Sequence, residues 1–100
     1  MLVHAVFFWL KPGLADAQRS RFRAEVRKLA AVRTVEQVYV GGPAPTPERG
    51  VTEKSFDLAL TIIFKDAAAH DAYQVDPIHL AFVEGNRDLW TRVQVFDSQE

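Results

Sequence analysis

A tyrosine and a histidine that can perform acid–base chemistry stand close together in the segment YQVDPIHLAFVE. A histidine can remove a proton near neutral pH, and a tyrosine hydroxyl can donate a hydrogen bond to a developing oxyanion. Between Tyr73 and His79 lie Asp76 and Pro77, which are typical of a helix start because aspartate caps a helix and proline suits its first turn. This places His79 in the first turn, where the helix dipole favours its neutral form. We therefore predict that Tyr73 and His79 are a catalytic pair.

The residues expected to surround this pair are apolar apart from one further histidine. Phe82 and Val83 follow His79 by three and four positions, so they share its face of the helix. His4 and Phe8 share one face of the apolar segment at the start of the chain, because side chains alternate along a strand. We predict that Phe8, Phe82 and Val83 form the walls of a ligand pocket and that His4 makes a second polar contact. The alternative is that both histidines are packed, hydrogen-bonded structural residues.

Metal and thiol chemistry are not predicted. The histidines and aspartates that could be combined into a metal site show no recognised ligand spacing, such as i, i+4 on one helix. That set is His4, His79, Asp57 and Asp76. His70, beside Asp71 in an alanine-rich helix, is expected to be solvated. The chain has no cysteine, which excludes a disulfide scaffold, a thiolate zinc site and a cysteine nucleophile, and we predict no cofactor.

These residues must be positioned by a small set of strands and helices. Alternating apolar patterns bounded by proline and glycine predict four strands, near Leu2 to Leu10, Val35 to Val40, Ser55 to Phe64 and Leu89 to Asp97. Helical spacing predicts three helices, from about Ala15 to Ala31, from the Asp66 cap to Tyr73, and from Asp76-Pro77 to a closing Gly85. The order β-α-β-β-α-β, with the second helical unit broken in two, is that of an α+β ferredoxin-like fold with a four-stranded antiparallel sheet.

The first strand is apolar on both faces, which bears on assembly. Right-handed crossovers place all helices on one face of the sheet and leave the other open. The open face would carry Val3, Ala5, Phe7 and Trp9. Because such a patch is large for a small domain, we predict a symmetric homodimer packed sheet to sheet. In the third strand, alternation assigns Phe56 to the same face as Leu58.

Composition sets the class of protein. The chain has 100 residues, 48% of them hydrophobic and 25% charged, and a formal net charge of −1, which predicts one domain with its core at about residues 2–97 and no affinity for nucleic acid. We interpret the arginine-rich face of the first helix as solvent-exposed and not as a nucleic-acid site. No segment has the length of a membrane span, and the apolar start lacks the basic region of a signal peptide. We expect a cytoplasmic protein without membrane association.

Several segments together resemble one protein family. They are VHAVFFWLK, VYVGG, FDLALTIIFKD, YQVDPIHLAFV and VQVFD, which in this order resemble the stress-responsive A/B barrel (Dabb) domain over about Leu2 to Asp97. The resemblance implies a ferredoxin-like fold and a dimeric α/β barrel. It also implies, from a plant polyketide cyclase of the family, acid–base roles for the residues at Tyr73 and His79, while His4 matches a histidine common in the first strand.

The resemblance leaves the function open. Most members have no established role, and this chain has Asp76 where a histidine is frequent and Leu58 near the place of a further pocket histidine of the cyclase. Three hypotheses follow. The first is an enzyme or binding protein for a small carbonyl or phenolic, polyketide-like molecule. The second is a non-catalytic, dimeric, stress-associated module, and the third is a cofactor-free monooxygenase-like protein. The loop GGPAPTPERG has no phosphate-binding lysine motif and is a candidate lid.

Overall fold

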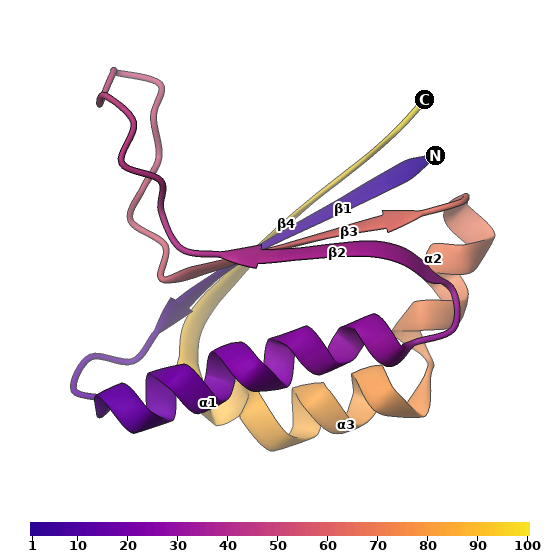
Figure 1. The fold of residues 1–100 in the computed structure, drawn as a ribbon, viewed down its shortest axis with the longest axis horizontal. Coiled ribbons are helices and arrows are strands. Elements are labelled where there is room, and N and C mark those ends of the chain that lie inside the picture. The colour runs from indigo at the N-terminus through magenta and orange to yellow at the C-terminus, as the bar shows by residue number, and fades with distance from the viewer.

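The sheet has the strand order β2-β3-β1-β4 and is antiparallel throughout (Figure 1). The computed structural model describes residues 1–100. Its strands are β1 (Leu2–Leu10), β2 (Val35–Gly41), β3 (Leu58–Phe64) and β4 (Trp90–Gln99). β1 and β3 are the central strands, so each is hydrogen-bonded to a neighbour along both of its edges. The architecture confirms the predicted ferredoxin-like fold.

All helices lie on one side of this sheet (Figure 1). They are α1 (Asp16–Arg27), α2 (Ala67–Gln74) and α3 (Pro77–Asn86), with short 3-10 helices at η1 (Lys28–Ala31) and η2 (Arg87–Leu89). The even-numbered side chains of β1 face these helices and are buried, whereas the odd-numbered ones are only half-buried. The core therefore lies between one face of the sheet and the helices, and it includes an aromatic group of Phe8, Phe22, Phe82 and Trp90.

The third strand begins later than the sequence pattern predicted, at Leu58 instead of Ser55. The chain bends at Asp57, whose side chain accepts a hydrogen bond from the Leu10 amide at 2.7 Å. Phe56 consequently packs against Phe7, with ring centroids 5.0 Å apart, on the open face. Its assignment to the face of Leu58 was wrong, because strand alternation applies only where the backbone is regularly extended.

The third helix was predicted to end at Gly85, but it continues beyond that residue. It runs to Asn86 and continues into η2, and Gly85 lacks the positive φ of a glycine cap, which only Gly13 adopts. The Asn86 side chain donates a hydrogen bond to the carbonyl of Phe82 at 2.9 Å. The last strand accordingly starts one residue later than expected, at Trp90.

The loop between β2 and β3, residues 42–57, rises from the side of the sheet opposite the helices (Figure 1). Trp9 donates its indole N–H to Ser55 of this loop at 3.0 Å, so the end of the loop is fastened to the open face. The loop therefore does not cover the helix side of the sheet in this structure. None of the helices has the length and apolar character needed to cross a bilayer.

Candidate active-site recess

A small recess lies between the sheet and the helices, and all six predicted site residues line it. Those six are His4, Phe8, Tyr73, His79, Phe82 and Val83. The other lining residues are Val6, Leu29, Leu60, Gln74, Trp90, Val93 and Val95. We call this set the histidine recess. Ten of the thirteen lining residues are hydrophobic, so a molecule bound there would be held mainly by apolar contacts.

The junction between α2 and α3 positions the Tyr73–His79 pair. Asp66 caps α2 by accepting a hydrogen bond from the Ala69 amide at 2.9 Å. The chain then turns through residues 75–76, and Asp76 caps α3 by accepting from the Ile78 amide at 2.8 Å. The rings of Tyr73 and His79 come to lie 4.5 Å apart between centroids. The predicted Asp-Pro helix start thus brings the two side chains together.

A hydrogen bond decides which nitrogen of His79 can act as a base. Its Nδ1 lies 3.1 Å from the backbone carbonyl oxygen of Gln74. A carbonyl can only accept, so Nδ1 carries the proton and Nε2 of the neutral ring has the free electron pair. The pKa of His79 is lowered from its ordinary value of 6.5, chiefly because burial disfavours the charged ring. At neutral pH the ring is therefore an acceptor at Nε2.

The pKa of His79 also depends on its neighbours. The bond to Gln74 opposes the effect of burial, as does the charge of Asp76, whereas His4 and His70 lower the pKa further. All three histidines of the chain thus gather in one part of the molecule. The net effect is that the pKa of His79 is lowered and its neutral form is favoured.

Tyr73 has the opposite protonation behaviour. It is 1% exposed, and burial raises its pKa well above the ordinary value of 10.0, with no hydrogen bond contributing to the shift. The hydroxyl therefore keeps its proton at every physiological pH and can donate it in a hydrogen bond. A neutral base and a protonated donor stand side by side, which is the division of roles that proton abstraction next to a carbonyl requires.

His4 is buried and paired with a residue that the sequence analysis did not single out. Its Nδ1 lies 2.5 Å from Oδ1 of Asp97, on the neighbouring strand β4, and the two residues are directly opposite each other in the sheet. Asp97 ends the alternating segment of the last strand, and only the strand register reveals the pairing. His4 also faces Tyr73, with ring centroids 5.9 Å apart.

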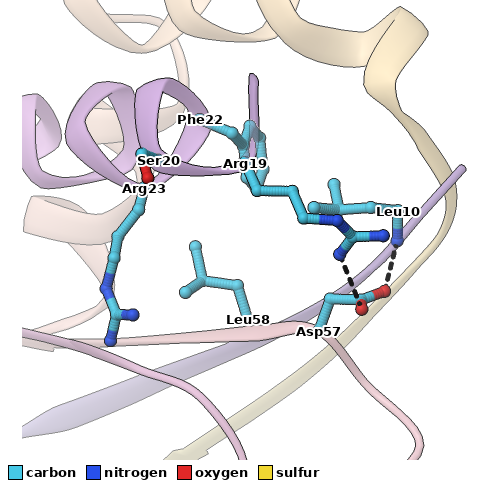
Figure 2. A pocket seen from close by; sticks show the side chains of 7 residues that line it. All are labelled: Leu10, Arg19, Ser20, Phe22, Arg23, Asp57 and Leu58. Atoms are coloured by element: carbon cyan, nitrogen blue, oxygen red, sulfur yellow. Dashed lines mark hydrogen bonds and ion pairs between the residues drawn. The ribbon is translucent and has the colours of Figure 1, made fainter. Parts of the chain in front are cut away.

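A second hollow lies on the same side of the sheet, between α1 and the ends of β1 and β3 (Figure 2). Its lining residues are Leu10, Arg19, Ser20, Phe22, Arg23, Asp57 and Leu58; we call it the arginine hollow. Asp57 accepts hydrogen bonds from Arg19 at 3.1 Å and from the Leu10 amide at 2.7 Å, the two dashed lines in Figure 2. Asp57 therefore lies in the arginine hollow, away from the histidines. The four residues considered as a metal site from the sequence, His4, His79, Asp57 and Asp76, do not come together in the structure.

His70 is not solvated, which corrects the prediction. Its side chain is 17% exposed and its ring packs against His4 and Phe64, with centroids 5.1 Å and 5.7 Å away. The reason is visible in the sequence: His70 precedes Tyr73 by three residues on one helix, so the two side chains share the face that packs on the sheet.

Fold and site together define a ferredoxin-like α+β protein with a histidine-containing recess between its sheet and helices. The model of the stress responsive A/B barrel domain (Dabb) matches residues 2–100, so the chain belongs to this family, as the sequence predicted. No protein of curated function matches the sequence significantly.

Solved structures confirm the fold. A Dabb family protein with a ferredoxin-like fold from Mesorhizobium loti is 24% identical, with a TM-score of 0.81 over 99% of this chain and 95% of that one. A dimeric ferredoxin-like protein of unknown function from Thermobifida fusca is 17% identical (TM-score 0.78; 99% and 90% covered). A hydroxynitrile lyase from Passiflora edulis is 19% identical (TM-score 0.79; 97% and 90% covered).

Proposed function

We propose that the histidine recess binds a small carbonyl or phenolic molecule and catalyses proton transfer on it. Nε2 of neutral His79 removes a proton next to the carbonyl, and the Tyr73 hydroxyl donates a hydrogen bond to the oxyanion that develops. The observation that carries the proposal is the hydrogen bond from His79 Nδ1 to Gln74, because it directs the basic nitrogen away from the backbone. His4 supplies a second polar contact, and Phe8, Phe82 and Val83 supply apolar walls.

The size of the recess narrows the substrate. Its volume is about 130 Å³, slightly below the roughly 150 Å³ of an apolar cavity that accepts benzene. A single aromatic ring or a short carbonyl compound fits this volume, whereas a longer polyketide chain would have to extend out of it. We therefore infer a ring-sized substrate with one or two oxygen atoms.

One protein of the same fold and the family resemblance are consistent with a small-molecule function, and neither identifies the substrate. The Passiflora edulis protein of the same fold is a hydroxynitrile lyase. The resemblance to the Dabb family implies, from its plant polyketide cyclase, acid–base roles for Tyr73 and His79, while Asp76 and Leu58 depart from the pattern of that family and of the cyclase. The competing hypothesis is a non-catalytic dimeric module, in which the same polar groups would only stabilise the fold.

A ligand screen by thermal unfolding separates these hypotheses. We expect small phenols, aromatic aldehydes or short diketones to raise the Tm of the wild type, since a ligand at about 100 times its Kd adds about 2.7 kcal/mol to stability. His79→Ala and Tyr73→Phe should lose most of this rise, and Arg23→Gln, in the arginine hollow, should keep it. A wild type that no compound stabilises would favour the module.

We further propose that the open face of the sheet forms a homodimer interface. One similar structure is of a dimeric protein, and no helix covers this face in Figure 1. Phe96, opposite Ala5 in the sheet, is 61% exposed and packs beside Phe7 with centroids 6.1 Å apart. With Val3 and Trp9 these residues form an apolar patch of the kind that buries about 800 Å² per partner in stable dimers.

Analytical ultracentrifugation at micromolar concentration tests this interface. The wild type should sediment as a dimer, and Trp9→Glu or Phe96→Glu should give a folded monomer because each places a charge in the apolar contact. Leu80→Glu is the matched control, since Leu80 is a 53% exposed residue of α3 on the helix side. A monomeric wild type, or a dimer that both open-face variants leave intact, would contradict the proposal.

A further inference from the structure

A group of potential metal ligands lies outside the Tyr73–His79 pair. His4, His70 and Asp97 each offer one ligand atom, and these atoms all lie within 4.8 Å of one another. They come from three different elements, β1, α2 and β4, so no spacing along the chain could predict them. Two imidazole nitrogens and one carboxylate oxygen are the ligands that divalent zinc, cobalt, nickel and iron prefer, whereas magnesium and calcium favour all-oxygen sites.

The spacing of these atoms is close to that of a coordination sphere. His4 Nδ1 lies 2.5 Å from Oδ1 of Asp97, and His70 Nε2 lies 4.0 Å from Oδ2 of the same carboxylate. Ligand bonds of about 2.0–2.2 Å at tetrahedral angles put neighbouring ligand atoms about 3.3–3.5 Å apart. The first of these two distances is shorter than such a spacing and the second is longer, and no two of the three ligand atoms are more than 4.8 Å apart. Side-chain adjustments of up to about 1.5 Å would therefore place an ion between the three groups.

The surroundings of His70 are those of a metal ligand. Its Nδ1 lies 3.0 Å from Oδ1 of Asp71, so a carboxylate accepts the Nδ1 proton and leaves the electron pair on Nε2. A ligand histidine commonly has such a carboxylate behind it, because the bond fixes the tautomer and the ring orientation. Gln74 also faces His70 Nε2, with its Nε2 at 3.2 Å, and this amide would have to turn aside.

We propose that His4, His70 and Asp97 bind a divalent transition-metal ion such as Zn²⁺. The ion replaces the proton that His4 Nδ1 shares with Asp97, and three protein ligands leave at least one coordination position for water or another ligand. The site shares His4 with the histidine recess but does not use the basic nitrogen of His79, so the inference does not rest on the proposed proton transfer. The chain has only three histidines, so His79 alone is left outside the site.

Titration of the untagged protein with Zn²⁺ and Co²⁺ tests the site. Isothermal titration calorimetry should show one ion per chain with micromolar or tighter affinity, and Co²⁺ should give visible absorption bands of a site with fewer than six ligands. In NMR spectra, Zn²⁺ should shift the ring signals of His4 and His70 more than those of His79.

Matched variants decide whether these residues are the ligands. His70→Gln and Asp97→Asn should each weaken binding by more than the roughly 10- to 100-fold expected for an outer partner such as Asp71→Ala, and His79→Gln should bind as the wild type does. Circular dichroism confirms that each variant is folded. Absence of binding in the wild type, binding that survives His70→Gln, or binding that requires His79 would each overturn the proposal.

Discussion

The two hollows on the helix side of the sheet hold polar groups in opposite situations. In the arginine hollow, the Asp57 carboxylate accepts hydrogen bonds from Arg19 and from the Leu10 amide, so both of its oxygens already have partners within the fold (Figure 2). In the histidine recess, the Tyr73 ring is buried and no hydrogen bond contributes to its pKa shift. His79 uses Nδ1 in a hydrogen bond to the Gln74 carbonyl, which leaves Nε2 available to a ligand. Polar groups that are left available inside an apolar site are those that can act on a ligand, because their binding capacity is not already used.

The largest expected effect is on catalysis. For any compound found to be converted in the recess, His79→Gln and Tyr73→Phe should each lower kcat by about 10²- to 10⁴-fold, as measured in steady-state assays. Tyr73→Phe should at the same time change the free energy of unfolding by less than about 0.5 kcal/mol, since it removes a hydroxyl without a partner. Arg23→Gln is the control and should leave kcat unchanged. Equal decreases of kcat in all three variants would contradict the assignment of catalysis to the histidine recess.

The next effect is on stability and concerns Asp57. Asp57→Ala should lower the free energy of unfolding in urea by about 1–3 kcal/mol, because the buried Leu10 amide loses its acceptor. Arg19→Gln should cost no more than about 1 kcal/mol, since the ion pair is partly exposed and screened by solvent. Asp57→Asn keeps an oxygen for the Leu10 amide and should behave like Arg19→Gln. If Arg19→Gln costs as much as Asp57→Ala, the ion pair and not the backbone bond is the main contribution.

The smallest effect is a pH dependence of stability that originates in the recess. Because the pKa of His79 is lowered on folding, the unfolded chain binds more protons than the folded protein in the window just below the ordinary pKa of 6.5. This contribution to stability is complete above that value and is lost as the pH falls through the lowered pKa. The free energy of unfolding of His79→Gln should therefore decrease less than that of the wild type between about pH 7 and about pH 5. Parallel profiles for the two proteins would rule out a lowered pKa at His79.

Most strands and helices could be predicted because the residue pattern within each segment favours the same secondary structure that the segment has in the fold. Alternation along β1, helical spacing in α1 and the Asp76-Pro77 start of α3 each depend on residues close together in the chain, and the family resemblance depends on the order of such segments. The errors fall where a long-range contact overrides the local pattern. At Asp57 the bond to Leu10 bends the chain and sends Phe56 to the open face, and at Gly85 the helix continues.

In the candidate site, too, features that depend on nearby residues could be predicted and features that depend on packing between distant segments could not. Tyr73 and His79 could be proposed as a pair from sequence because one short segment carries both, and the structure places the six predicted residues around one recess. Asp97 and the packed position of His70 were not found, since they depend on the register of β1 against β4 and on the docking of α2. Sequence by itself therefore determined the elements, the helix start that holds His79 and the family. Only the tertiary structure decided which nitrogen of His79 is free, that Asp97 pairs with His4, and that three ligand atoms from β1, α2 and β4 converge, because such distances arise from packing between elements remote in the chain.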